Sequence, residues 1–130
     1  MESALRTSLV DWLASDTELS ASLNAVQEEG PSPAPAPTLS IAASASADWS
    51  TKTSTGREVR LALELLDRSD DPAASAAIAT RIEQRIATMA PAQPSFRIVS
   101  TQFLRSRVER RARSIRAVLL EYRFRLLSTS

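Results

Sequence analysis

The chain has 130 residues, which suits one domain with one core, and its hydrophobic share of 43% and charged share of 24% are ordinary for a globular protein. It contains no cysteine and no histidine, which excludes disulfides, thiol chemistry, and the commonest general base and metal ligand. It has no apolar run of about 18 residues, so we expect no membrane span. The N-terminus has no basic segment leading into an apolar stretch, so we expect no secretory signal and a cytoplasmic location by default.

Charge is unevenly distributed, although the net charge is only +1. Residues 96–130 hold nine arginines against two acidic residues, whereas residues 1–95 hold seven basic and thirteen acidic side chains. This asymmetry predicts two differently charged faces, and in a self-assembling protein the acidic face of one copy would meet the basic face of the next. The alternative is that both faces are simply solvated, because charge concerns association and not fold.

Two helices are predicted at the N-terminus. Four apolar residues at helical spacing predict a helix over residues 2–14: Leu5, Leu9, Trp12 and Leu13. Ser15, followed three residues later by Glu18, has the form of a capping box and predicts a second helix to about residue 25. The proline-rich segment 30–37 is expected to be a stiff, extended connector inside one domain, because too few residues precede it to bury a core of their own.

The middle of the chain predicts two strands joined by a long loop. Residues 38–45 form the first expected strand, and the polar, unpatterned residues 45–56 are expected to form a mobile loop. In residues 57–68 apolar and polar side chains alternate, which favours a strand although the leucine content would also allow a helix.

The last part predicts a helix followed by a hairpin. Asp71 and Pro72 start the helix as N-cap and first helical residue, and Pro91 ends it. Residues 96–127 are expected to form two long strands, the second with strict alternation of apolar and charged residues. The predicted fold is a single α+β domain over residues 1–130, with a four-stranded, mainly antiparallel sheet, helices on one face and the order α-α-β-β-α-β-β.

The last hairpin carries the strongest functional signal. Six arginines, with Glu109 as the one acid among them, are expected in the turn between its strands: Arg105, Arg107, Arg110, Arg111, Arg113 and Arg116. Arginine forks suit phosphate groups of a nucleic acid or carboxylates of a partner subunit. The remaining interpretation is a solvated hairpin tip whose charge guards against aggregation.

Trp49 is the second unusual residue, because it lies in a polar loop. It either anchors in a partner's pocket or covers the subunit's own core. No catalytic constellation is visible, since no histidine is present to activate a serine and the two glycines form no phosphate-binding loop. We therefore expect no enzymatic activity, no cofactor and no metal site.

Several segments, in this order and spacing, resemble one known family. They are LRTSLVDWLASDTELSASLNAV, then PAPTLSIAAS, then ADWSTKTSTGREVRLALELLDR with Asp48, Trp49, Ser50, Gly56 and Arg57, and last the hairpin from FRIVSTQFLRSR to LEYRFRL. The chain resembles the phage tail completion family, the tail terminator (tail-to-head joining) proteins of long-tailed phages and of gene transfer agents. It departs from that pattern in the last hairpin, where Ala112-Arg113-Ser114 replaces the family's frequent Asp-Gly turn.

The resemblance implies a structural protein that forms a hexameric ring, caps the tail tube and joins it to the head connector, with DNA passing through the ring. It implies three protein partners, namely further copies of the chain, the tail tube protein and a connector or stopper protein, and no membrane. The implied location is the tail-to-head joint of a virion or phage-like particle assembled in the bacterial cytoplasm. Trp49, Arg57 and the hairpin arginines are then candidates for the interface or the lumen. The alternative is a small nucleic-acid-binding module that uses the arginine-rich hairpin.

Overall fold

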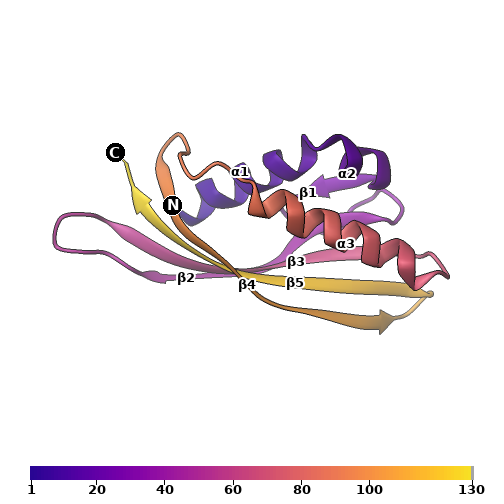
Figure 1. Ribbon diagram of the computed structural model, residues 1–130. Coiled ribbons are helices and arrows are strands. Elements are labelled where there is room, and N and C mark those ends of the chain that lie inside the picture. Colours follow the sequence, from indigo (N-terminus) through magenta and orange to yellow (C-terminus); the bar gives the residue numbers. More distant parts are fainter. Residues whose placement is uncertain (130) are drawn as a thin grey trace.

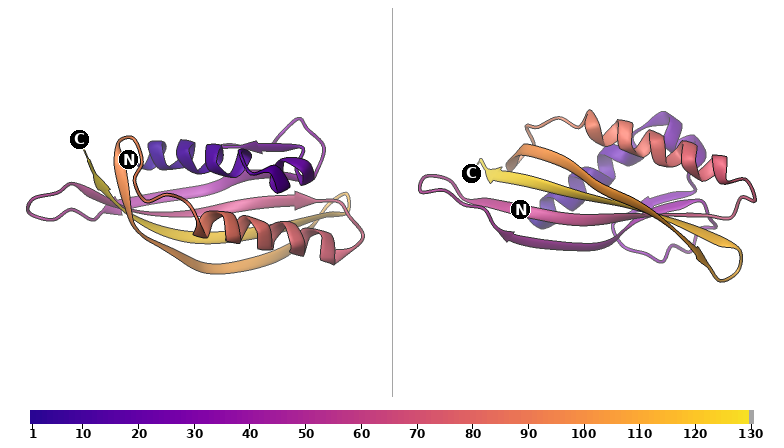
Figure 2. Two further views of the ribbon diagram at one scale, coloured as in Figure 1. Left: turned by 45° about the horizontal axis from the view of Figure 1, so that its top comes forward. Right: turned by 60° about the horizontal axis from the view of Figure 1, so that its bottom comes forward.

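One sheet with helices on a single face makes up the fold. The computed structural model describes residues 1–129. Its elements are α1 (Glu2–Ala14), α2 (Thr17–Ser22), β1 (Ala25–Gln27), β2 (Thr38–Asp48), β3 (Gly56–Asp67), α3 (Pro72–Ala87), β4 (Phe96–Arg111) and β5 (Ile115–Ser128). The strands join in the order β1-β2-β3-β5-β4, and the helices lie together above them (Figures 1 and 2). The predicted α+β class is therefore confirmed. None of these described helices is both long and apolar enough to cross a membrane.

The sheet has five strands and is mixed, so the prediction of four mainly antiparallel strands was wrong in detail. The additional strand, β1, pairs in parallel with the start of β2. The predicted second helix is shorter than expected because the chain leaves α2 at Ser22. Asn24 then donates its backbone N–H to the carbonyl oxygen of Pro37 at 2.8 Å and its side-chain amide to that of Pro35 at 2.7 Å. These contacts with the connector replace further helical turns.

The predicted core faces of the central strands are confirmed by their burial, although Ala117 and Leu119 on the other face of β5 are buried as well. β3 pairs with β2 on one side and with β5 on the other, and its successive side chains point alternately to the core and to the open face. Full burial of a leucine or phenylalanine side chain stabilises the fold by about 1.5–3 kcal/mol. The core-facing residues of the two strands are 5% exposed or less: Val59, Leu61, Leu63, Leu65, Val118, Leu120, Tyr122, Phe124 and Leu126.

Two aspartates begin helices. Asp71 accepts a hydrogen bond from the backbone N–H of Ala73 at 3.0 Å and caps α3, as predicted. The cap of α2 is Asp16 and not Ser15, because the Asp16 carboxylate accepts the backbone N–H of Leu19 at 3.1 Å. Asp16 is 4% exposed and also accepts hydrogen bonds from the Arg81 side chain of α3, which lower its pKa to about 2. One carboxylate thus joins α2 to α3.

The β2–β3 hairpin extends beyond the helices (Figure 1). β2 continues to Asp48 and β3 begins at Gly56, so residues 45–48 of the expected loop belong to a strand and the turn covers residues 49–55. The backbone N–H of Trp49 donates to the Gly56 carbonyl oxygen at 3.0 Å. A Cβ atom on Gly56 would lie 2.5 Å from the Trp49 carbonyl oxygen, so this close approach requires glycine. Mobility of the turn stays a prediction.

The turn of the last hairpin is much shorter than the arginine cluster. β4 continues to Arg111 and β5 begins at Ile115, and φ angles of 62° at Arg113 and 59° at Ser114 give the left-handed conformation of a tight hairpin turn. Of the six arginines expected in the turn, only Arg113 lies there. Arg116 lies on β5, and the other four lie on β4, because an edge strand exposed to solvent accepts long charged side chains without interrupting its backbone ladder.

Candidate assembly interface

β4 forms one margin of the sheet and is exposed along most of its length. Every residue from 99 to 108 is exposed. Four large apolar side chains are among them, Val99 at 47%, Phe103 at 42%, Leu104 at 36% and Val108 at 61%, and within residues 1–129 no other large hydrophobic side chain is exposed. Register shifts between β4 and β5 leave Val99 and Leu104 as the additional residues of two bulges. A concentration of exposed apolar side chains on one strand is typical of a binding surface.

The open face of the sheet, opposite the helices, carries pairs of arginine and glutamate across neighbouring strands. Arg105 of β4 lies opposite Glu121 of β5, and their side chains approach to 2.5 Å. Arg111 reaches Glu64 of β3 at 2.7 Å, and the hydrogen bonds that it donates to Glu64 and, to a smaller extent, to Glu109 raise its pKa. Three further ion pairs on this face join Arg107 to Glu109, Arg125 to Glu58 and Arg60 to Glu58.

The structure divides the predicted arginine cluster into two groups. Arg105, Arg107 and Arg111 belong to the paired open face. Arg110, Arg113 and Arg116 lie at the end of the hairpin, where Arg116 donates to the Ser69 carbonyl oxygen at 3.3 Å. Within residues 1–129, the side chains of Arg110 and Arg113 make no hydrogen bond or ion pair.

The β2–β3 turn lies at the opposite end of the sheet from the β4–β5 turn (Figure 1). Trp49 begins this turn, and Arg57 follows it on β3. Trp49 is half-buried and outside the core cluster, and the guanidinium carbon of Arg125 lies 5.5 Å from its ring centre. Arg57 is exposed and lies opposite Asp48, whose pKa is lowered by a hydrogen bond from Ser50 and, to a smaller extent, by Arg57. The sequence-predicted site residues therefore occupy three separate places: the open face, the end of the β4–β5 hairpin and the β2–β3 turn.

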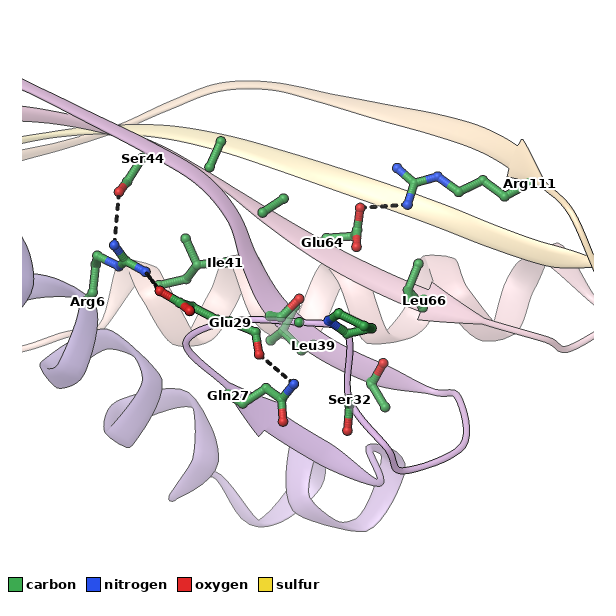
Figure 3. Close-up of a pocket in the computed structure, with 16 residues that line it drawn as sticks. Arg6, Gln27, Glu29, Ser32, Leu39, Ile41, Ser44, Glu64, Leu66 and Arg111 are labelled. Carbon is green, nitrogen blue, oxygen red and sulfur yellow. Dashed lines mark hydrogen bonds and ion pairs between the residues drawn. The ribbon is translucent and has the colours of Figure 1, made fainter.

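The second free margin of the sheet was not predicted from the sequence. β1 pairs only with residues 38–40 of β2, so residues 41–48 have a strand neighbour on the β3 side alone. A cleft of about 640 Å³ borders this margin, with Arg6 and Glu29 on one side and Glu64 and Arg111 on the other (Figure 3). A signal was present in the sequence, because residues 42–47 are all alanine or serine and carry nothing bulky or charged.

Comparisons with known proteins agree with this architecture. A family model described as tail completion protein gp17 matches residues 7–127. A solved chain from the virion of a native gene transfer agent particle has a similar fold, with a TM-score of 0.79 and 22% identity over 97% of this chain and 96% of that chain. No curated protein matches significantly. The family match confirms the resemblance to tail completion proteins and the expected location in a virion.

Proposed function

The chain belongs to the tail completion protein gp17 family, and we propose that this structural virion protein is the tail terminator of its particle. In this proposal it forms a hexameric ring that caps the finished tail tube and joins it to the head connector, and DNA passes through the ring. Its partners are further copies of itself, the tail tube protein and the connector or stopper protein. The observation that carries the proposal is the family match over residues 7–127.

The charges of the open face support a role as the wall of the channel. A wall that DNA slides along must not hold phosphate groups tightly. Most arginines of the open face already face a glutamate, as Arg105 faces Glu121 and Arg125 faces Glu58. A paired guanidinium has fewer free donors for phosphate, so the face stays polar without becoming a strong anion site. We propose no chemical step for this protein.

The proposal is tested by removing the gene from a strain that produces the particle and examining the products by electron microscopy. We expect separate heads and tubes of uncontrolled length, and rescue by a plasmid copy of the gene. A reconstruction of the joint in rescued particles should show six copies around the tube. Joined particles of normal tail length without the gene, or a different copy number at the joint, would contradict the proposal.

A free-standing nucleic-acid-binding module is the second candidate, and Arg110 and Arg113 at the end of the hairpin are the observation in its favour. Binding of the purified protein to duplex DNA, measured across salt concentrations, separates the two. A phosphate binder loses roughly one logarithmic unit of affinity per tenfold rise in salt for each phosphate contacted. We expect little affinity for free duplex DNA and binding to purified tail tubes instead.

A further inference from the structure

We propose that neighbouring subunits of the ring join edge to edge, with β4 of one copy pairing antiparallel with the free part of β2, residues 41–48, of the next. This inference rests on the proposed ring and names the contact that closes it. Residues 41–48 have hydrogen-bonding groups of the backbone on the side away from β3 and no strand to receive them. Free edges of this kind pair readily with another strand, and natural proteins usually protect them with lysine, proline or a covering element. Within this segment only Asp48 is charged, and there is no proline.

The two free margins lie at the same level of the sheet. Following the paired residues across the strands leads from Ile41 to Ser106 and from Asp48 to Ile98. The free part of β2 is therefore level with the part of β4 that contains Val99, Phe103 and Leu104. In a closed ring whose strands run nearly parallel to the ring axis, the rotation that relates two subunits brings β4 of one beside β2 of the next without any shift along the axis.

The strand directions suit the same arrangement. β2, β3, β5 and β4 are antiparallel to one another in turn, so β4 runs opposite to β2. A rotation about an axis nearly parallel to the strands leaves the direction of the strands unchanged, so β2 of the neighbouring subunit runs in the same direction as β2 of the first. β4 and the neighbour's β2 are then antiparallel, and the alternation continues from one subunit to the next.

Charge distinguishes this contact from pairing between two identical margins. Residues 96–111 hold five arginines and one glutamate, whereas residues 1–48 hold seven acidic side chains and one arginine. Glu29 lines the cleft beside β2, Glu28 lies 3.9 Å from Arg6, and Glu2 accepts a hydrogen bond from Ser44 of β2. Two β4 margins would repel each other, while β4 against β2 brings opposite charges together.

The helix layer is also completed by this contact. Phe103 lies on the helix side of β4, where it packs edge-on against Tyr122 with ring centres 5.4 Å apart. It borders a hollow of about 290 Å³ next to α3, lined also by Glu83 and Ile86. α1 lies over β2, since Glu2 and Arg6 both bond to Ser44. The neighbour's β2 would therefore bring its α1 beside α3 and cover the exposed Phe103 ring.

Engineered disulfides test the contact, because the chain has no native cysteine. The residues paired across the sheet lead from Ala45 to Gln102, and both are exposed. Within one subunit they are separated by three strand spacings, roughly 14 Å, too far for a disulfide, which needs Cα atoms within about 7 Å. In assembled particles under mild oxidation, we expect the double variant Ala45→Cys/Gln102→Cys to form covalent oligomers up to the size of the ring. Ser100→Cys in place of Gln102→Cys tests the neighbouring register.

Single variants supply the controls. Ala45→Cys and Gln102→Cys alone should remain monomeric on a non-reducing gel, and a mixture of the two should give dimers only. Ala45→Cys with Ala73→Cys, at an exposed position at the start of α3, should not cross-link. Dimers from Gln102→Cys alone would show β4 pairing with β4 and overturn the inference.

A second measurement needs no substitution. Backbone amides of residues 42–47 should exchange with solvent about tenfold more slowly, or slower still, in the ring than in the free subunit. If a ring is present at the joint but neither cross-links nor protection are seen, only the edge pairing is wrong. If no ring forms at the joint, the proposed function is wrong and the edge pairing is wrong with it.

Discussion

β4 and β5 are the two strands of one hairpin, yet they differ in almost everything that burial decides. β5 lies between β3 and β4, and its core-facing side chains are closed off by the helices. β4 has a strand neighbour on one side only, and of its sixteen residues just Phe96 and Ile98 are buried. This contrast indicates that β5 stabilises the subunit, whereas β4 keeps its apolar and charged side chains available for another molecule. Six substitutions, in four experiments, test this division.

Two phenylalanines of this hairpin should differ most in how much their substitution lowers the free energy of unfolding. Phe124 of β5 is 0% exposed, so Phe124→Ala should lower the free energy of unfolding by about 3–5 kcal/mol. Phe103 of β4 is 42% exposed, and Phe103→Ala should cost about 0.5–1.5 kcal/mol, mainly from its contact with Tyr122. Urea unfolding followed by circular dichroism measures both. Similar losses for the two variants would mean that β4 belongs to the core as much as β5 does.

The buried Asp16 provides a pH-dependent test of the helix-covered side. Its pKa of about 2 lies below the ordinary value of 3.8, mainly because of the hydrogen bonds from Arg81. Its contribution to stability is therefore fully present above about pH 4 and is lost as the pH falls toward 2. Asp16→Asn keeps a helix-capping oxygen but removes the charge, and its stability should change less than that of the wild type between pH 5 and pH 2 in urea titrations. Equal pH dependence of the two proteins would contradict this role.

Arg110 and Arg111 are neighbours on β4, but of the two only Arg111 forms ion pairs within residues 1–129. Arg111→Glu places a like charge next to Glu64 and should lower the free energy of unfolding by about 1 kcal/mol. Arg110→Glu, at a side chain without an ion pair in residues 1–129, should leave stability unchanged. Both reversals should reduce the yield of joined particles, because Arg110→Glu places acid where a partner's acidic surface is expected and Arg111→Glu adds negative charge to the proposed channel wall. Normal yields from the double reversal would identify these arginines as solvated.

The smallest effect on the subunit is expected at Trp49. Its ring lies outside the core cluster and 5.5 Å from the Arg125 guanidinium, so Trp49→Ala should cost less than about 1 kcal/mol of stability. We predict that the same substitution impairs assembly, because a half-buried aromatic at the end of a projecting hairpin is suited to contact a partner. Calorimetry of the free subunit and counts of joined particles check the two halves. A fall of many degrees in the midpoint of thermal unfolding would place Trp49 in the subunit's own core.

Local sequence pattern was sufficient to predict the elements whose apolar residues recur at regular spacing or whose first residues form a helix cap. Alternation predicted β3 and β5, helical spacing predicted α1, and the Asp71-Pro72 pair predicted the start of α3. Each of these signals depends on a few neighbouring residues, because side-chain direction repeats every two residues in a strand and about every 3.6 in a helix. The order and spacing of several segments along the chain were enough to identify the resemblance to the family.

The position of each strand in the sheet depends on tertiary contacts and could not be predicted from local pattern. β1 exists because Asn24 bonds to the connector, which lies more than ten residues away in the chain. Four of the six arginines expected in a turn lie on β4, because the backbone ladder with β5 continues to Arg111. Whether an apolar residue such as Phe103 or Phe124 is exposed depends on whether its strand lies at the edge or in the centre of the sheet. That position is set by pairing between segments that are distant in the chain. The kinds of elements and their apolar faces could therefore be predicted from local pattern. The two free margins of the sheet could not, because long-range hydrogen bonds between strands leave no periodic signal in the chain.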